Sequence, residues 1–327
     1  MSVVDITVLG GGDIAETCRE LLRGAGCDAD EVTPGSHRPV IVGHSPHVFL
    51  TIRSLVEAGH HVLVACPAVL TVPQLVALFA GRGLGQVLSL WSESRRHPGH
   101  RLVAGLVEAD EQAWHPRYIR QVTSLDEKPG AGLMRWRLLE AIALVAAYAG
   151  VPPLTLTATA SLNPSRGCPD QEILILRYEN LEAYIQVSLG EPMARRETLI
   201  AAAARKAYVD ELNCSTPVRL FDDEPAAARK AARRISCPSP SSAELSRQQC
   251  LAFVEATQNR AVAEAEARLW LQALAVLQVA ESSLAADGAP RSVGESAPSQ
   301  SRLAATGKSI SSSRVGRPPL LRLVAAR

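Results

Sequence analysis

The chain has 327 residues, 47% of them hydrophobic and 20% charged, which is enough for about two domains with a sizeable core. The formal net charge is +1, so no overall field would recruit nucleic acid or a membrane surface. No apolar run approaches the ~18 residues of a spanning helix, and the N-terminus lacks the basic region and cleavage site of a signal peptide. We expect a cytoplasmic protein with no nucleic-acid or membrane partner.

The cysteines indicate neither a disulfide framework nor a metal site. They stand at positions 18, 27, 66, 168, 214, 237 and 250. None forms a CxxC pair and their count is odd, which suits a reducing compartment better than a disulfide or zinc scaffold. We therefore expect no bound metal.

The first third of the chain alternates short apolar strands with helices. Strands are expected at residues 5–9, 40–42, 60–67 and 86–92, and helices at 10–26, 48–59, 71–83 and 97–110. This alternation is typical of a parallel sheet with right-handed crossovers. The stretch before Val40 is too short for a normal strand and helix, so we expect an α/β, Rossmann-like domain over residues 1–113, trimmed by about one βα unit.

From residue 114 the pattern changes. Residues 154–161 and 181–188 alternate apolar and polar side chains, which is typical of an antiparallel sheet with one covered face. An apolar helix is expected at 131–150, and a late helix at 243–280 with a break near Gln258. Residues 114–284 are thus predicted to form an α+β domain with a mostly antiparallel open sheet, through which copies could associate. Residues 285–327 are rich in Ser, Ala, Gly, Pro and Arg and are predicted to be a disordered basic tail.

A glycine-rich turn follows the first strand directly. Gly10, Gly12 and Ala15 have dinucleotide-binding spacing, in which glycines let the backbone approach a pyrophosphate at a helix N-terminus. Asp13 and Ile14 lie in the first helical turn, where the charge of Asp13 suits the helix dipole but would repel a phosphate. Two interpretations stay open here: a site for NAD or NADP, or an inherited turn that binds nothing.

Two further features border this predicted crevice. Asp28 and Asp30 lie near the spacing of the acidic residue that bonds the ribose, although a solvated loop is an equally simple explanation. Because that segment is truncated, the sequence does not decide between NAD and NADP. His44 and His47 lie in the turn after the second strand, either as catalytic groups beside the nicotinamide or as ordinary loop residues.

Several motifs together resemble the Gfo/Idh/MocA oxidoreductases. Residues 44–67, HSPHVFLTIRSLVEAGHHVLVACP, resemble the family's Thr-Pro turn, its helix ending in Glu-Ala-Gly and its His-Val-Leu-Val-Glu-Lys-Pro strand end. Residues 94–101, SRRHPGHR, resemble its Arg-Arg-Phe-x-Pro motif. Residues 130–150 resemble its helix with Gly-Gly-x-Leu-x-Asp-x-Gly-x-His-x-x-Asp. The resemblance runs in order along most of residues 4–283.

The resemblance implies NAD or NADP as cofactor and hydride transfer with a small-molecule carbonyl or imine. It implies that Ser45, Pro46 and Pro67 join the Gly10–Ala15 turn in binding the cofactor. Arg95 and Arg96 match the family's arginines and could hold an anionic substrate, or they could form the solvated start of a helix. Trp136 is a further candidate for the substrate site, or a residue of the core or cleft wall.

The catalytic positions depart from the family pattern. Cys66 stands where the family has its lysine, Trp136 replaces an aspartate, Glu140 falls at the histidine and Ala141 at the following aspartate. A thiol with a reference pKa of ~8.5 is neutral at pH 7 and cannot replace a fixed cation. Cys66, Glu140 and His47 are the candidate proton donors, although Cys66 could equally be a small buried hydrophobe.

Three functional hypotheses therefore remain from the sequence. The chain could be an NAD(P)-dependent oxidoreductase of altered chemistry, acting on an imine, enone or keto-sugar-like small molecule. It could be a catalytically inactive homologue that serves as a binding or partner subunit. It could also be a relict that binds no dinucleotide.

Overall fold

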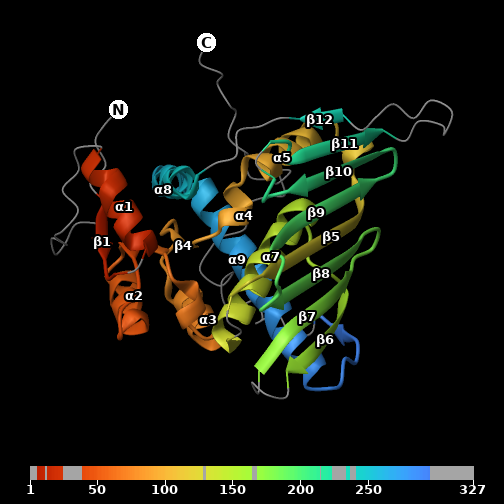
Figure 1. Ribbon diagram of the computed structural model, residues 1–327. Coiled ribbons are helices and arrows are strands. Elements are labelled where there is room, and N and C mark those ends of the chain that lie inside the picture. Colours follow the sequence, from red (N-terminus) through yellow and green to blue (C-terminus); the bar gives the residue numbers. More distant parts are fainter. Residues whose placement is uncertain are drawn as a thin grey trace, which may run out of the picture.

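The computed structural model describes residues 6–11, 13–24, 39–127, 130–163, 168–213, 215–222, 233–235 and 241–294. Two sheets lie beside each other, and helix α9 passes between them (Figure 1). This is the predicted combination of a parallel sheet and a mostly antiparallel one, so the predicted fold class is confirmed.

The first sheet contains four parallel strands in the order β1-β2-β3-β4. They are β1 (Thr7–Leu9), β2 (Pro39–Val42), β3 (His61–Val64) and β4 (Leu88–Leu90). The common doubly wound order has further strands beyond the first one. The described sheet has none there, and only residues 25–38 separate α1 from β2. Because residues 25–38 lie outside the described residues, the trimming by about one βα unit stays a prediction.

This half contains the four predicted helices, each slightly shorter than expected, and three short helical segments that the sequence did not predict. They are α1 (Asp13–Gly24), α2 (Val48–Glu57), the 3-10 turn η1 (Pro67–Val69), α3 (Val72–Gly81), α4 (Glu93–Arg96), α5 (Pro98–Ala109) and α6 (Glu111–Trp114). Thr71 caps α3, accepting a bond from the Gln74 amide while the Gln74 side chain accepts one from the Thr71 amide. After α2 the chain turns at Gly59 with a positive φ of 83°, which glycine adopts without strain.

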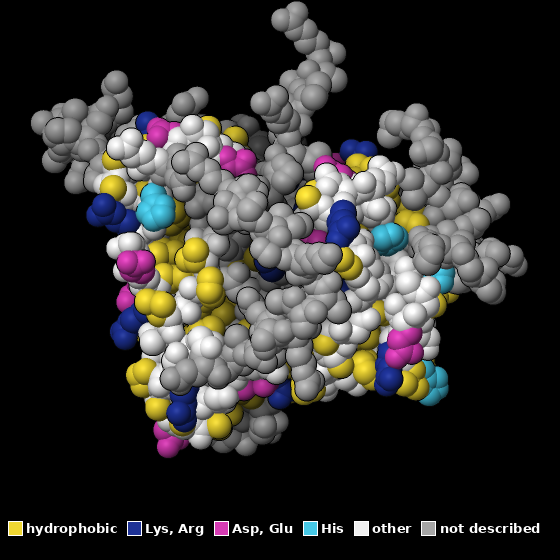
Figure 2. Space-filling view, turned by 180° about the vertical axis from the view of Figure 1, so that it is seen from behind, with side chains coloured by type: hydrophobic (Ala, Val, Ile, Leu, Met, Phe, Trp, Pro, Cys, Tyr) yellow, Lys and Arg dark blue, Asp and Glu magenta, His cyan; other side chains and the backbone are white. Residues whose placement is uncertain are grey.

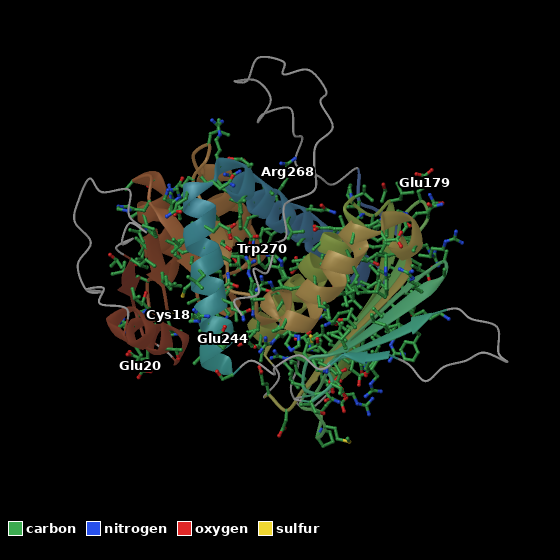
Figure 3. The ribbon with its side chains drawn as sticks, turned by 90° about the horizontal axis from the view of Figure 1, so that it is seen from above. Cys18, Glu20, Glu179, Glu244, Arg268 and Trp270 are labelled. Carbon is green, nitrogen blue, oxygen red and sulfur yellow. The ribbon has the colours of Figure 1, made fainter. Side chains whose placement is uncertain are left out.

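The two faces of the parallel sheet bury different partners. Val40 and Val62 face a core shared with α2 and α3, whereas Ile41 and Leu63 face α1 and α8 (Ser242–Gln258). Helix α8 docks on α1 where the sulfurs of Cys18 and Cys250 lie 3.7 Å apart (Figure 3). A helix late in the chain thus covers the first sheet.

The second sheet has nine strands in the order β12-β11-β10-β9-β5-β8-β7-β6-β13, and its only parallel pair among the described residues is β5 with β8. The strands are β5 (Pro116–Leu125), β6 (Thr155–Asn163), β7 (Cys168–Arg177), β8 (Glu182–Leu189), β9 (Arg195–Ala202), β10 (Arg205–Asp210), β11 (Val218–Asp222), β12 (Arg233–Ile235) and β13 (Arg291–Ser292). Helices α7 (Ala131–Ala149) and α9 (Arg260–Leu284) cover one face. The predicted break near Gln258 is confirmed, since α8 ends there. The association of copies through this sheet stays a prediction.

The first ten residues of the predicted disordered tail are ordered. Residues 285–294 fold back, and β13 pairs with β6 through Arg291 and Ser292. The Ser283 hydroxyl accepts a bond from Ala158 N (3.0 Å) and donates one to Ala289 O (2.8 Å). Composition alone suggested disorder from residue 285, but these backbone partners order its first part. Residues 295–327 lie outside the described residues, as do Asp28 and Asp30.

The face seen from behind carries Lys, Arg, Asp and Glu side chains scattered among hydrophobic ones (Figure 2). No large patch of a single charge appears among the described residues on that face. None of the helices in the described part of the chain is long and apolar enough to span a membrane.

Gly132 allows α7 to pack tightly against η1. A Cβ at this position would collide with the carbonyl oxygen of Ala68, whereas one at Gly105 in α5 would meet nothing within 4 Å. We expect Gly132→Ala to lower the free energy of unfolding by about 1–3 kcal/mol through overpacking. Gly105→Ala should raise it by up to ~1 kcal/mol through helix propensity. Urea unfolding of both variants checks this, and equal effects would contradict the tight approach.

Glu172 on β7 points to the helix-covered face beside the buried Leu174 and Leu176. Burial raises its pKa to about 7, a rise that Arg135 moderates and Glu281 reinforces. A folded-state pKa above the unfolded value of ~4.3 contributes stability below that value, which is lost as the pH rises through 7.

We expect Glu172→Gln to be more stable than the wild type at pH 8, by about 2 kcal/mol, and to gain little at pH 4. Glu182→Gln, at an exposed ion pair with Arg177, is the control and should change stability by less than ~1 kcal/mol at either pH. Urea unfolding at both pH values measures the difference. A gain that does not depend on pH would rule out titration of Glu172.

Candidate functional site at the carboxyl edge of the parallel sheet

Two turns interlock at the carboxyl edge of β1 and β2. Gly10 adopts a φ of 81°, and a Cβ there would lie 2.8 Å from the carbonyl oxygen of His44. Gly11 N donates to His44 O (2.9 Å), His44 N donates to Gly11 O (2.8 Å), and Gly43 N donates to Leu9 O (2.7 Å). The two turns are therefore fixed relative to each other. Gly10 and Gly43 each lie too close to backbone atoms of the other turn to carry a side chain.

Space remains on the outer side of the glycine turn. A Cβ on Gly11 would meet nothing within 4 Å, in contrast to one on Gly10 or Gly43. Helix α1 starts two residues later, so its unpaired amides lie next to this space. An open backbone turn at a helix N-terminus fits the pyrophosphate of a dinucleotide.

The structure describes the remaining residues of the predicted turn to different extents. Ala15 is buried, and its Cβ would lie 2.7 Å from a Cβ on Gly43. Gly12 lies outside the described residues. Asp13 and Ile14 begin α1, but their side chains are outside the described part as well.

The second turn is largely exposed. Ser45 is half-buried, Pro46 and His47 are exposed, and Ser45 O accepts a bond from Val48 N (3.2 Å). His47 precedes α2 without a capping bond from its side chain. These residues therefore border the open side of the sheet edge.

Cys66 follows β3 and precedes the η1 turn, where it is half-buried. Burial raises the pKa of its thiol, so the thiol is protonated at neutral pH. An activated nucleophilic cysteine has the opposite shift. Among the predicted roles, this geometry favours a weak donor or a packing residue over a nucleophile.

The position between Pro67 and α7 is filled by apolar side chains. Pro67, Trp136, Leu139 and Leu277 contribute to the walls of a cavity of only about 10 Å³. Trp136 is buried and stacks on Trp270 with ring centroids 6.0 Å apart. A cavity of this size holds one water molecule at most, so no substrate fits between Pro67 and this part of α7.

Glu140 is buried and held by three donors. Its carboxylate accepts bonds from Ser92 Oγ (3.1 Å), Ser94 N (3.2 Å) and Arg137 Nη1 (3.2 Å). It therefore ties α7 to α4. This arrangement uses the carboxylate to hold the two helices together.

Arg95 and Arg96 meet Glu266 of α9 in a cluster that the sequence did not predict. Arg95 donates two bonds of 2.9 Å to the Glu266 carboxylate, which also accepts from Ser89 Oγ (3.0 Å) and Trp270 Nε1 (2.8 Å). Burial alone would raise the pKa of Glu266, but the arginines hold it well below its usual range. Arg96 Nη2 lies farther away, at 3.9 Å.

A second buried cluster was missed altogether. His100 Nε2 lies 3.0 Å from Glu211 and its Nδ1 3.0 Å from the Tyr148 hydroxyl, while Ser94 Oγ donates to Glu211 (2.9 Å). Burial lowers the pKa of nearby His97 to about 4. The only sequence signal was the histidine pair in HPGH, whose partners lie far along the chain. Across the described residues, no group of three or more His, Cys, Asp or Glu side chains could hold a metal ion.

Glu140→Gln separates a structural role from a catalytic one. We expect it to lower the free energy of unfolding by about 1.5–3 kcal/mol, the range for bonds to a charged group. Glu281→Gln, which breaks an exposed pair with Arg135, should cost less than ~1 kcal/mol. Urea unfolding compares the two variants, and an unchanged stability of Glu140→Gln would contradict the packing role.

Comparison with solved structures identifies the fold. No protein-family model matches the sequence, and no curated protein is a detectable relative. UDP-N-acetylglucosamine 3-dehydrogenase from Acidithiobacillus ferrooxidans matches with a TM-score of 0.64 and 17% identity, over 86% of this chain and 98% of its own.

Two further structures match over similar lengths. An NAD binding oxidoreductase from Klebsiella pneumoniae has a TM-score of 0.72 and 11% identity, over 89% of this chain and 99% of its own. An oxidoreductase from Sinorhizobium meliloti has a TM-score of 0.69 and 12% identity, over 89% of this chain and 100% of its own. At these identities the likeness establishes architecture. This chain therefore shares the two-part fold of these dehydrogenase and oxidoreductase structures, which agrees with the fold that its motifs predicted.

Proposed function

We propose that this chain is an NAD(P)-dependent oxidoreductase of altered chemistry, with its cofactor at the carboxyl edge of the first sheet. The observation that carries the proposal is the interlock of Gly10 and Gly11 with Gly43 and His44 beside open space at the start of α1. The names of two similar structures, a dehydrogenase and an NAD binding oxidoreductase, support the same assignment.

Different residues at this edge would bind different parts of the cofactor. The Gly11 backbone and the first amides of α1 would hold the pyrophosphate, because their dipoles favour negative charge. Ser45, Pro46 and Pro67 would border the nicotinamide ring, as the family resemblance implies. The nicotinamide supplies a hydride when the cofactor is bound.

The proton-donating groups narrow the substrate class. The Cys66 thiol has a raised pKa, Glu140 is bonded to three donors, and His47 is exposed to solvent. A ketone needs a proton as its oxygen becomes an alkoxide. An iminium ion does not, since the hydride forms a C–H bond, the C=N π pair moves to nitrogen and the product is a neutral amine. Among imine, enone and keto-sugar substrates, this site favours the iminium form.

A separate observation favours a second function. The apolar packing of Pro67, Trp136 and Leu139 leaves a cavity of about 10 Å³ where α7 approaches η1. Such closure favours a catalytically inactive protein that binds a cofactor or serves a partner subunit. Binding and turnover measurements separate the two functions.

The open turn at Gly11 provides a direct test of cofactor binding. We expect Gly11→Ala to place a methyl group in the pyrophosphate space without strain, and to weaken NADPH or NADH binding by at least about tenfold. Gly81→Ala, whose methyl group also meets open space but lies at the end of α3, should leave binding unchanged. Calorimetric titration of both cofactors measures the difference.

The outcomes decide between the functions. Cofactor binding with reduction of a cyclic iminium substrate supports the first, and Cys66→Ala should then keep its rate within about tenfold because no acid is needed. Binding without turnover on iminium, enone and keto-sugar substrates supports the second. The absence of binding at millimolar cofactor would reject the oxidoreductase and an inactive cofactor-binding protein, and would leave only the partner subunit.

A further inference from the structure

A second cavity lies away from the sheet edge, among α5, the end of α7, α8 and α9. Its volume is about 350 Å³, within the range of about 300–1,000 Å³ of small-molecule sites. None of the residues assigned to the cofactor edge, such as Gly11, Ser45 and Cys66, contributes to its walls. It is therefore separate from the site proposed above.

Most of the cavity wall is apolar. Ala104 and Val107 come from α5, Ala252 and Phe253 from α8, and Leu269 from α9. Figure 3 shows Trp270 in the space between α8 and α7, with Arg268 at the outer edge of α9. A wall of this composition accommodates a hydrocarbon body rather than a sugar.

Two glutamines on facing helices leave polar atoms unpaired in this cavity. Gln248 of α8 donates its Nε2 to Glu244 (3.0 Å), but its Oε1 is buried with no partner among the described residues. Gln272 of α9 has a buried Nε2 that likewise lacks a partner there. A buried polar group without a partner is unfavourable. One free acceptor and one free donor suit a ligand that offers an amide.

A partly unpaired cation also borders the cavity. Arg96 lies 3.9 Å from Glu266, whose carboxylate is already bonded to Arg95, and its Nε makes a long bond of 3.4 Å to Gln249. Burial lowers its pKa to about 10, so it stays charged at neutral pH. Apart from the ion pair of Arg95 and Glu266, the cavity wall contains three arginines (Arg96, Arg101 and Arg268) and two glutamates (Glu108 and Glu255). Positive charge is therefore in excess there.

We propose that this cavity binds a small organic carboxylate that carries an amide and an apolar chain, of the N-acyl amino acid class. The carboxylate pairs with Arg96, the ligand amide N–H donates to Gln248 Oε1, and its carbonyl accepts from Gln272 Nε2. The apolar chain lies against Val107, Phe253 and Leu269. This assignment does not depend on the proposed oxidoreductase activity.

The test uses N-octanoylglycine, its neutral counterpart N-octanoylglycinamide, and decanoate, which has no amide. Calorimetry should give one site for N-octanoylglycine on the full chain, and about tenfold weaker binding of the other two ligands. Arg96→Gln should weaken N-octanoylglycine by about tenfold yet leave the glycinamide unchanged. Gln272→Leu should weaken N-octanoylglycine but not decanoate.

Control variants distinguish a direct role in binding from a role in maintaining the fold. Arg53→Gln, on α2 in an exposed pair with Glu57, should alter no binding constant, and Ala252→Phe should abolish binding by filling the cavity. The proposal is overturned if N-octanoylglycine does not bind at millimolar concentration. It is also overturned if Arg96→Gln weakens the charged and neutral ligands equally, because the arginine would then only maintain the fold. NADPH binding by Arg96→Gln should equal that of the wild type.

Discussion

The carboxylate of Glu266 is the constraint on which the arrangement of the two sheets depends. It lies on α9 and accepts bonds from Arg95 on α4, Ser89 on β4 and Trp270 on its own helix. A buried carboxylate needs this many donors, because desolvation of an unpaired charge is costly. Two of these donors, Arg95 and Ser89, come from the first half of the chain, whereas Glu266 lies on α9. The cluster therefore joins the parallel sheet to the helix that covers the second sheet.

This use of charged groups explains why residues that resemble catalytic ones do different work here. Arg95 is paired with Glu266, Glu140 is bonded to Ser92, Ser94 and Arg137, and Trp136 is stacked on Trp270. Arg95, which matches the family pattern, and Trp136 and Glu140, which depart from it, thus all take part in packing. The glycine turn after β1, at the same carboxyl edge, keeps its open space.

Local signals predicted the elements well, and long-range contacts were beyond the sequence. Gly59, Thr71 and the break near Gln258 marked helix ends correctly, because caps and glycine conformations act within a few residues. Arg95 looked free to bind an anion because its partner lies 171 residues away. Residues 285–294 looked disordered by composition, yet they are held by backbone atoms of β6, which composition does not report. The cavity walls come from strand β4 and helices α4, α5, α7, α8 and α9, which are spread along the chain, and they left no local pattern.

The coupling between Arg95 and Glu266 tests this account most directly. Urea unfolding of the wild type, Arg95→Met, Glu266→Gln and the double variant gives the interaction free energy of the pair. If the cluster is structural, the coupling should be at least about 1.5 kcal/mol. The destabilisations of the two single variants should then add up to more than that of the double variant. A coupling below about 0.5 kcal/mol would contradict the account, and would mean that Arg95 is free to serve a ligand instead.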